Sequence, residues 1–268
     1  MKYTTDIARE IRKLSLKMVY AAKASHIGGA LSMVDILAVL YNEFLNIDPS
    51  NPDNPDRDRF LLSKGHTCTG LYATLALKGF FPVKDLDKYA KDGSKFISHT
   101  SHYIPGIEIS AGSLGHALPV CCGLALAAKR KKKYWKTYCL ISDGELDEGS
   151  NWESILMAPQ LKLDNLILIV DYNKIQSLGS VKDVIDLNPL SEKFLAFRWE
   201  TFEVDGHDHQ ALKNVFANVQ ESNAKPKVII AHTIKGKGVS FMEDKLLWHY
   251  RSPNEDQFND AIKELNNQ

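Results

Sequence analysis

Five short apolar runs, alternating with helical stretches, constrain the fold of this chain most strongly. The runs span residues 59–63, 136–142, 165–173, 200–205 and 227–233. Helical spacing lies between them at 66–79, 114–130, 150–162, 189–197 and 208–221. Strands that are apolar on both faces and alternate with helices are typical of a mainly parallel sheet covered on both sides. The sequence therefore predicts an α/β fold, preceded by two helices at 5–24 and 31–45.

The charge balance and the cysteines exclude several classes of protein. The chain has 33 basic and 33 acidic residues, so we expect neither nucleic acid nor membrane as a partner. The basic run at 129–136 fits a solvated helix end. The four cysteines have no zinc-ligand spacing, and no stretch reaches the roughly 18 apolar residues of a membrane span. We expect a reduced, cytoplasmic protein.

Polar residues follow two consecutive strands. Asp143 comes directly after one apolar run and Asn173 ends the next. Parallel strands bring their carboxyl ends to one edge of the sheet, so these side chains should be neighbours. Carboxylate and amide oxygens suit Mg²⁺ or Ca²⁺. A helix-capping aspartate and a turn-forming asparagine remain the alternatives, because each residue alone is uninformative.

Other loops contain candidate histidines and charges. His66 opens a helix, where it could contact an anion, or it could serve only in capping. The irregular segment 97–117 contains His99, His102 and His116, which could act in acid–base chemistry or simply be polar loop residues. The loop 232–243 reads as flexible. Around Asp143, we expect Glu145, Asp147 and Glu153 to be helix N-terminal charges.

The sequence around these residues resembles the N-terminal half of transketolase. Five segments occur in that family's order and spacing: "RFLLSKGHTCTGLYATLALKGFF", "PGIEISAGSLGHALPVCCGLALAAK", "SDGELDEGSNWES", "LDNLILIVDYNKIQ" and "KVIIAHTIKGKGVSFME". The resemblance implies one thiamine-diphosphate (diphosphate-binding) domain over residues 1–268. It implies one component of a split enzyme that transfers a two-carbon ketol unit from a ketose or ketose phosphate to an aldose.

The resemblance also implies partners. A second chain, the C-terminal transketolase subunit, should carry the pyrimidine-binding domain and complete the active site. Paired sites favour two copies of each chain. Sugars or sugar phosphates are the implied substrates, and thiamine diphosphate with Mg²⁺ (or Ca²⁺) is the implied cofactor.

The resemblance also implies roles for individual residues, according to their positions in the matching segments. Asp143, Asn173 and the Ile175 carbonyl resemble the metal ligands. The residues that resemble contacts to the cofactor are His66, Gly112, Leu114, Asp143, Gly144 and Asn173. The residues that match catalytic positions are His26, His66, His99, His249 and Glu148, the last at the dimer interface.

Several positions depart from the family's pattern. Ser142 stands where glycine is usual, Thr100 and Ile27 stand where proline is usual, and His116-Ala117 stands in place of the usual Gln-Gly. The segment "WHYRS" lacks the small residue that the family has next to His249. These changes lie near the substrate region, so we expect a specialised sugar substrate. The alternatives are a related thiamine-dependent lyase or decarboxylase, a Mg²⁺-dependent phosphohydrolase and a non-catalytic scaffold subunit.

Overall fold

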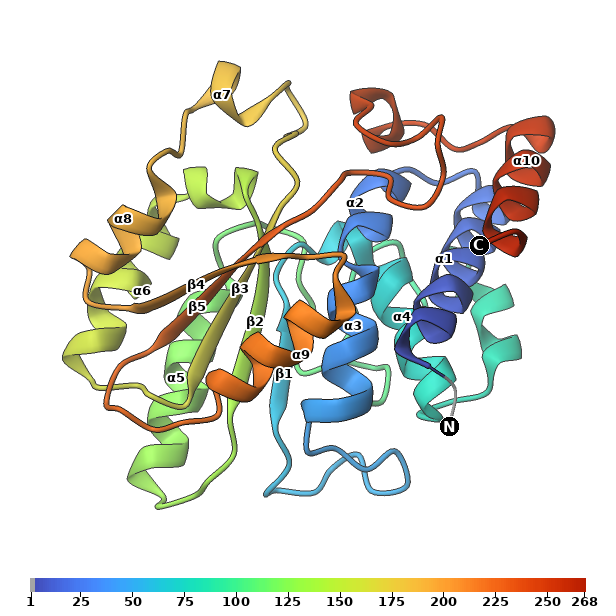
Figure 1. Ribbon diagram of the computed structural model, residues 1–268. Helices are drawn as coiled ribbons and strands as arrows, with labels where there is room; N and C mark the ends of the chain where they lie inside the picture. Colours follow the sequence, from blue (N-terminus) through green and yellow to red (C-terminus); the bar gives the residue numbers. More distant parts are fainter. Residues whose placement is uncertain (1–2) are drawn as a thin grey trace.

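A five-stranded parallel sheet organises the computed structural model, which describes residues 3–268. The strand order is β1-β2-β3-β5-β4, and all neighbours are parallel (Figure 1). The strands are β1 (Arg59–Leu62), β2 (Thr137–Ser142), β3 (Leu166–Tyr172), β4 (Glu200–Asp205) and β5 (Lys227–His232). The predicted parallel α/β fold is confirmed, and each strand lies within or close to its predicted apolar run.

Helices cover both faces of the sheet. They are α1 (Thr4–Ala22), α2 (Ile27–Ser32), α3 (Val34–Val39), α4 (Cys68–Lys78), α5 (Ala117–Arg130), α6 (Gly149–Gln160), α7 (Val181–Val184), α8 (Leu190–Ala196), α9 (His209–Asn218) and α10 (Glu255–Asn266). Successive strand residues point to opposite faces: Ile167 and Ile169 pack into the core beneath α3, α4 and α9, whereas Leu168 and Val170 pack beneath α5 and α6. The sheet is therefore buried on both sides.

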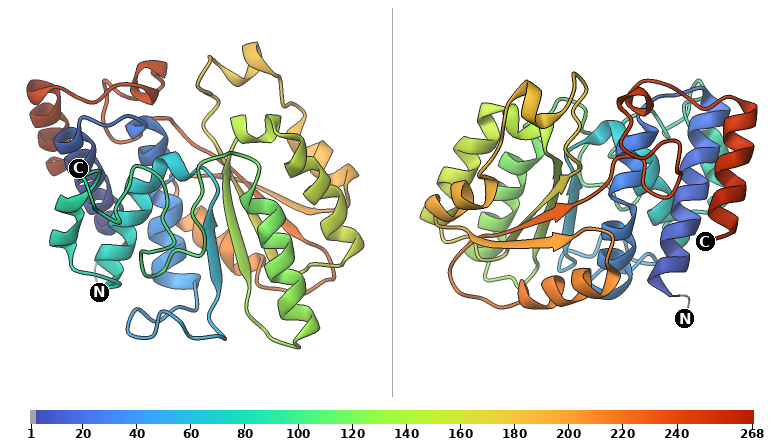
Figure 2. Two further views of the ribbon diagram at one scale, coloured as in Figure 1. Left: turned by 180° about the vertical axis from the view of Figure 1, so that it is seen from behind. Right: turned by 45° about the horizontal axis from the view of Figure 1, so that its top comes forward.

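The N-terminal helices differ from the prediction. The second predicted helix, 31–45, is divided into α2, α3 and a π-helical turn at Leu40–Phe44. The sequence pattern also missed α10, which packs against α1 (Figure 2). A capping box between Asn254 and Gln257 begins α10, and Ala261 and Leu265 are buried against α1 and Trp248.

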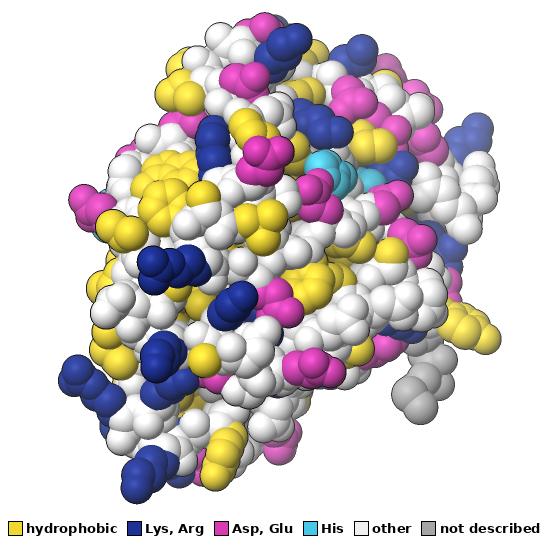
Figure 3. Space-filling model, turned by 60° about the vertical axis from the view of Figure 1, so that its left-hand side comes forward, with side chains coloured by type: hydrophobic (Ala, Val, Ile, Leu, Met, Phe, Trp, Pro, Cys, Tyr) yellow, Lys and Arg dark blue, Asp and Glu magenta, His cyan; other side chains and the backbone are white. Residues whose placement is uncertain are grey.

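One face of the molecule exposes apolar side chains around α6 and α8. We call it the α6–α8 surface. Hydrophobic side chains gather there in Figure 3. Its residues are Trp152, Leu156, Met157, Ile185, Leu195 and Phe197. Leu156 is 65% exposed and Leu195 56%, which is unusual for leucines of a fully covered helix. Among residues 3–268, no helix is both long and apolar enough to cross a membrane.

Candidate active site

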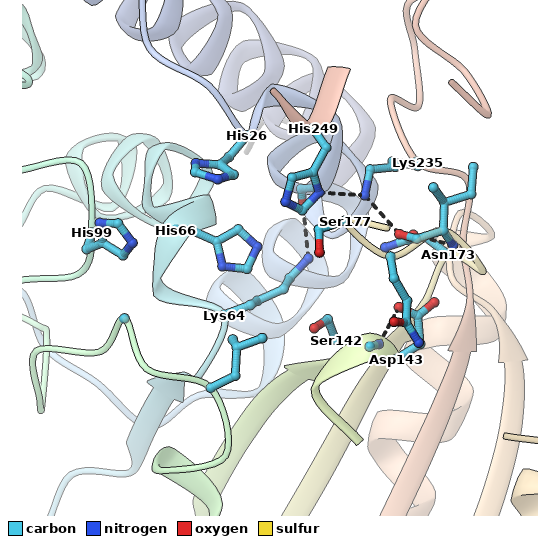
Figure 4. Close-up of a pocket in the computed structure, with 16 residues that line it drawn as sticks. His26, Lys64, His66, His99, Ser142, Asp143, Asn173, Ser177, Lys235 and His249 are labelled. Carbon is cyan, nitrogen blue, oxygen red and sulfur yellow. Dashed lines mark hydrogen bonds between the residues drawn. The ribbon is translucent and has the colours of Figure 1, made fainter. Parts of the chain in front are cut away.

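A cavity of about 270 Å³ lies at the carboxyl ends of the central strands (Figure 4). This is the edge at which parallel α/β sheets bind ligands. Except for Glu148, every site residue that the family resemblance implies lines it. These residues are His26, His66, His99, Gly112, Leu114, Asp143, Gly144, Asn173, Ile175 and His249. Segments far apart in the chain therefore meet in one pocket.

Oxygen atoms gather at one end of the cavity. Asp143 Oδ1 accepts the Gly144 N–H at 2.7 Å and Oδ2 accepts the Lys174 N–H at 2.5 Å. Asn173 Oδ1 accepts the Ile175 N–H at 3.2 Å. Burial, together with the nearby charge of Asp171, raises the pKa of Asp143 to about 6. The carboxylate, amide and carbonyl oxygens are the donor set that a hard divalent cation prefers, so these residues fit a Mg²⁺ ion.

Neighbouring side chains pack closely against two glycines of the cavity. A Cβ on Gly144 would lie 2.9 Å from Cγ of Gln176, and one on Gly112 would lie 3.1 Å from Cδ2 of His99. Both glycines line the cavity, so a side chain at either position would displace a lining residue. Glycine at both positions therefore lets Gln176 and His99 keep their places in the lining.

Lys235 lies between the oxygen cluster and the histidines, although the sequence suggested only a flexible loop. Its Nζ donates to the Ile175 carbonyl at 2.9 Å and lies 3.1 Å from Nδ1 of His249 (Figure 4). The side chain is 2% exposed, and burial lowers its pKa to about 8. The prediction of a flexible loop was wrong for this residue. The sequence around a single lysine in a glycine-containing segment does not indicate that its side chain will be buried.

Lys64 forms a second buried cation at the cavity, and the sequence missed it too. Its Nζ donates to Asp171 Oδ2 and, at 2.8 Å, to the Gly29 carbonyl. Asp171 also accepts from the hydroxyls of Ser32 and Thr233. These bonds hold the pKa of Asp171 below its usual value, although burial alone would raise it. Asp171 is the buried counter-charge that keeps Lys64 in place.

Four histidines occupy the other end of the cavity. The ring centroid of His26 lies 4.9 Å from that of His66, 5.1 Å from that of His249 and 6.4 Å from that of His99. Burial and neighbouring cationic groups lower the pKa of His26 to about 4 and of His249 to about 3, and lower that of His66 strongly. His26, His66 and His249 are therefore neutral imidazoles, each with one donor and one acceptor nitrogen.

The geometry agrees with comparisons to known proteins. Residues 3–265 match the family described as transketolase, thiamine diphosphate binding domain. The chain belongs to this transketolase family. The family expected from the five sequence segments is thereby confirmed.

The relatives include components of split transketolases. The chain is 41% identical to a subunit of the apulose-4-phosphate transketolase of Phocaeicola vulgatus, over 95% of this chain and 90% of that one. It is 40% identical to the 6-deoxy-6-sulfo-D-fructose transketolase subunit SqwG of Clostridium sp. strain MSTE9, over 96% and 94%. The matched region therefore covers most of this chain and most of both subunits.

Solved transketolases share the fold but are longer. The Campylobacter jejuni transketolase superposes with a TM-score of 0.93 at 32% identity, covering 99% of this chain. The present chain spans only 43% of the length of that transketolase.

The acidic segment of this transketolase chain differs partly from expectation. Glu145 lies in the first turn of the short 3₁₀ helix Gly144–Asp147, as expected, but it is also fully buried: its carboxylate accepts from the Ser63 hydroxyl and, at 2.8 Å, from the Gly115 N–H. Glu153 lies in the second turn of α6, beyond the first turn. Asp147 ends a short 3₁₀ turn. Glu145 thereby connects the loop after β1 with the loop of Gly112 and Leu114, which the sequence pattern could not reveal.

Glu148 and two of the loop histidines lie outside the cavity lining. Glu148 is the exposed N-cap residue of α6. His102 is exposed and contacts Ser110, and the exposed His116 lies with Nδ1 2.9 Å from the Leu114 carbonyl. Only His99 of the three histidines in segment 97–117 reaches the cavity.

The departures from the transketolase pattern have local structural roles. Thr100 Oγ1 accepts the Ala111 N–H at 2.9 Å, a bond that proline could not make. Ile27 is buried in the cluster that contains Leu16 and Trp248. Ser142 lines the cavity beside Asp143. Of these, Ser142 alone faces the space where a ligand would lie.

Proposed function

We propose that this chain is the diphosphate-binding subunit of a thiamine-diphosphate-dependent transketolase. The enzyme transfers a two-carbon ketol unit from a ketose, or ketose phosphate, to an aldose. The observation that carries the proposal is the two-ended cavity: an oxygen cluster at Asp143 and Asn173 and a group of four histidines lie at opposite ends. This arrangement suits a ligand with an anionic tail and a reactive centre near sugar hydroxyls.

In this proposal, Asp143, Asn173 and the Ile175 carbonyl hold Mg²⁺. Gly144, Gly112, Leu114 and His66 contact thiamine diphosphate, and Lys235 adds positive charge beside the diphosphate. The metal would neutralise the diphosphate and compensate the buried Asp143 carboxylate, whose raised pKa signals the cost of its charge in the unliganded site. When bound, thiamine diphosphate supplies a carbon nucleophile and an electron sink for breaking the sugar carbon–carbon bond.

The histidines of this chain handle the sugar. His26, His66, His99 and His249 are close enough to contact adjacent hydroxyls of one substrate. A neutral imidazole can accept a proton from a hydroxyl and can also donate a hydrogen bond to it. We propose that these rings orient the substrate and move protons at its hydroxyl groups. The lowered pKa values keep the rings of His26, His66 and His249 neutral at physiological pH.

A second chain would complete the active site. The chain covers 90% of the length of a relative named as a transketolase subunit but 43% of a solved transketolase. We propose that the partner is a C-terminal transketolase subunit with the pyrimidine-binding domain, in a complex of two copies of each chain. Exposed Glu148 and the apolar α6–α8 surface support a covered interface on this side.

The substrate class follows from the relatives and from the cavity. The names of two relatives specify apulose-4-phosphate and 6-deoxy-6-sulfo-D-fructose. We propose a similarly specialised ketose or ketose phosphate for this chain, with Ser142 facing the ligand. We also propose that residues 1–268 form one domain. Because all four cysteines are free and buried, we place the protein in the reducing cytoplasm.

Cofactor binding tests the proposed function. Thiamine diphosphate is titrated calorimetrically into the complex with its partner, with and without Mg²⁺, for the wild type and for Asp143→Asn. We expect Mg²⁺-dependent binding that Asp143→Asn weakens by about a hundredfold, because one charged ligand is lost. The exposed Asp147→Asn serves as the matched control and should bind like the wild type. Equal binding by Asp143→Asn and the wild type would contradict the metal assignment.

A further inference from the structure

A buried hydrogen-bond network lies behind the loop that carries Lys235. Its residues are not among the site residues described above. Asp35 of α3 is its centre and is 4% exposed. The Arg12 guanidinium donates to Asp35 Oδ1 at 3.1 Å and to Oδ2 at 2.5 Å. His207 Nδ1 lies 2.7 Å from Oδ2, and His209 Nε2 lies 3.0 Å from Oδ1. One carboxylate thus joins α1, α3 and the β4–α9 connection.

Two members of this network also hold the loop after β5. The Ile234 N–H donates to His207 Nε2 at 2.8 Å. Arg12 Nε donates to the Lys237 carbonyl at 2.9 Å. These two anchors lie on either side of Lys235. The Gly236 N–H, which donates to the Gly28 carbonyl at 2.9 Å, adds a third anchor.

The hydrogen bonds fix the tautomer of His207. Because Nε2 accepts the Ile234 N–H, this nitrogen carries no proton. The ring proton is therefore on Nδ1, which donates to Asp35 Oδ2. Asp35 orients the imidazole in the same way that a carboxylate orients a metal-binding or catalytic histidine. Here, however, the acceptor nitrogen of the ring binds a backbone N–H.

The anchored loop determines where the Lys235 ammonium lies. Between its two anchors the side chain extends into the cavity and reaches the Ile175 carbonyl and His249. A shift of the backbone at Ile234 would move this buried cation away from both contacts. We propose that His207 is a positioning residue that, oriented by Asp35, holds the loop so that Lys235 faces the diphosphate. This inference rests on the proposed function for the identity of the ligand.

Two substitutions at His207 separate its contacts. In His207→Asn the amide nitrogen overlays Nδ1, so the bond to Asp35 is kept and the acceptor for Ile234 is lost. In His207→Gln the amide oxygen overlays Nε2, so the acceptor for Ile234 is kept. His209→Asn is the matched control: it removes one bond to Asp35 from a residue that makes no contact with the 234–238 loop in the hydrogen bonds of residues 3–268.

The decisive measurement is amide hydrogen exchange at Ile234 in the full chain without ligand. We expect exchange at Ile234 to accelerate at least tenfold in His207→Asn. It should remain near the wild-type rate in His207→Gln and His209→Asn. Unchanged exchange in His207→Asn would overturn the proposal. Equal acceleration in His209→Asn would also overturn it, because it would indicate general loosening of the network.

Binding of Mg²⁺ and inorganic pyrophosphate to the same variants in complex with the partner chain gives the functional readout. We expect His207→Asn to weaken the affinity by about tenfold and His207→Gln to restore most of it. Equal affinity in wild type and His207→Asn would contradict the link to Lys235. If the wild type binds no pyrophosphate, the proposed function fails, while the exchange result still decides whether His207 holds the loop.

Discussion

Lys64 and Asp171 form an ion pair whose side chains are 1% and 0% exposed, directly beneath the candidate active site. Lys64 follows β1, and Asp171 lies in β3, two strands away. The pair connects the outer strand of the cavity to the central strand β3, which Asn173 directly follows. A buried ion pair of this kind is costly to break, because the remaining charge has no partner.

We therefore predict that Asp171→Asn lowers the free energy of unfolding by about 3 kcal/mol. Urea denaturation followed by circular dichroism measures the change. The exposed pair of Asp85 and Lys88 provides the control, and Asp85→Asn should leave the denaturation midpoint unchanged. The double variant Lys64→Met/Asp171→Leu should be more stable than Asp171→Asn. If Asp171→Asn were as stable as the wild type, the ion pair would make no contribution to the free energy of unfolding.

The histidine cluster predicts a pH dependence of stability. In the unfolded chain His26 and His249 titrate near their ordinary pKa of 6.5, whereas in the folded chain the pKa values are about 4 and about 3. Between these values the unfolded state binds more protons, so stability is complete above pH 6.5 and falls as the pH decreases towards 4.

The variant His249→Asn isolates this contribution. The unfolding free energy of the wild type minus that of the variant should decrease as the pH falls from 7 to 4. Taking the difference removes the opposite contribution of Asp143, whose raised pKa acts in the same range. A difference that stays constant over this pH range would mean that His249 is not held neutral by the fold.

Much of the fold could be predicted from the sequence, but only part of the site. Asp143 and Asn173 were predicted because strand ends in a parallel sheet meet at one edge. Lys64 and Lys235 were missed because their burial depends on partners distant in sequence, such as Asp171 at a position 107 residues further along. The periodic pattern also cannot distinguish a buried carboxylate like Glu145 from a solvated one, because its partners are hydroxyl and backbone groups from other loops.

We predict that Lys235→Met weakens binding of thiamine diphosphate to the complex by at least tenfold, because a buried cation beside the diphosphate is lost. Lys237→Met is the control, since Lys237 pairs with Glu243 in a partly exposed position outside the cavity lining. Fluorescence titration at fixed Mg²⁺ concentration measures both affinities. If the two variants bind equally well, the placement of Lys235 has no consequence for the cofactor.

The α6–α8 surface predicts where the partner binds. Leu156→Glu should leave the free energy of unfolding within about 0.5 kcal/mol of the wild type, because the side chain is exposed. Association with the partner chain should weaken by at least tenfold, because a charge is placed in an apolar interface. Leu77→Glu on α4, where Leu77 is 36% exposed, is the matched control. Analytical ultracentrifugation of mixtures compares them, and unchanged association by Leu156→Glu would place the interface elsewhere.

Reconstitution of ketol transfer tests the proposed function most directly. This chain, its partner chain and the mixture are each assayed with ketose phosphate donors and aldose acceptors, with and without thiamine diphosphate and Mg²⁺. We expect activity only in the mixture, and only when both thiamine diphosphate and the metal ion are present. Activity of this chain alone, or of the mixture without thiamine diphosphate, would contradict the proposed function.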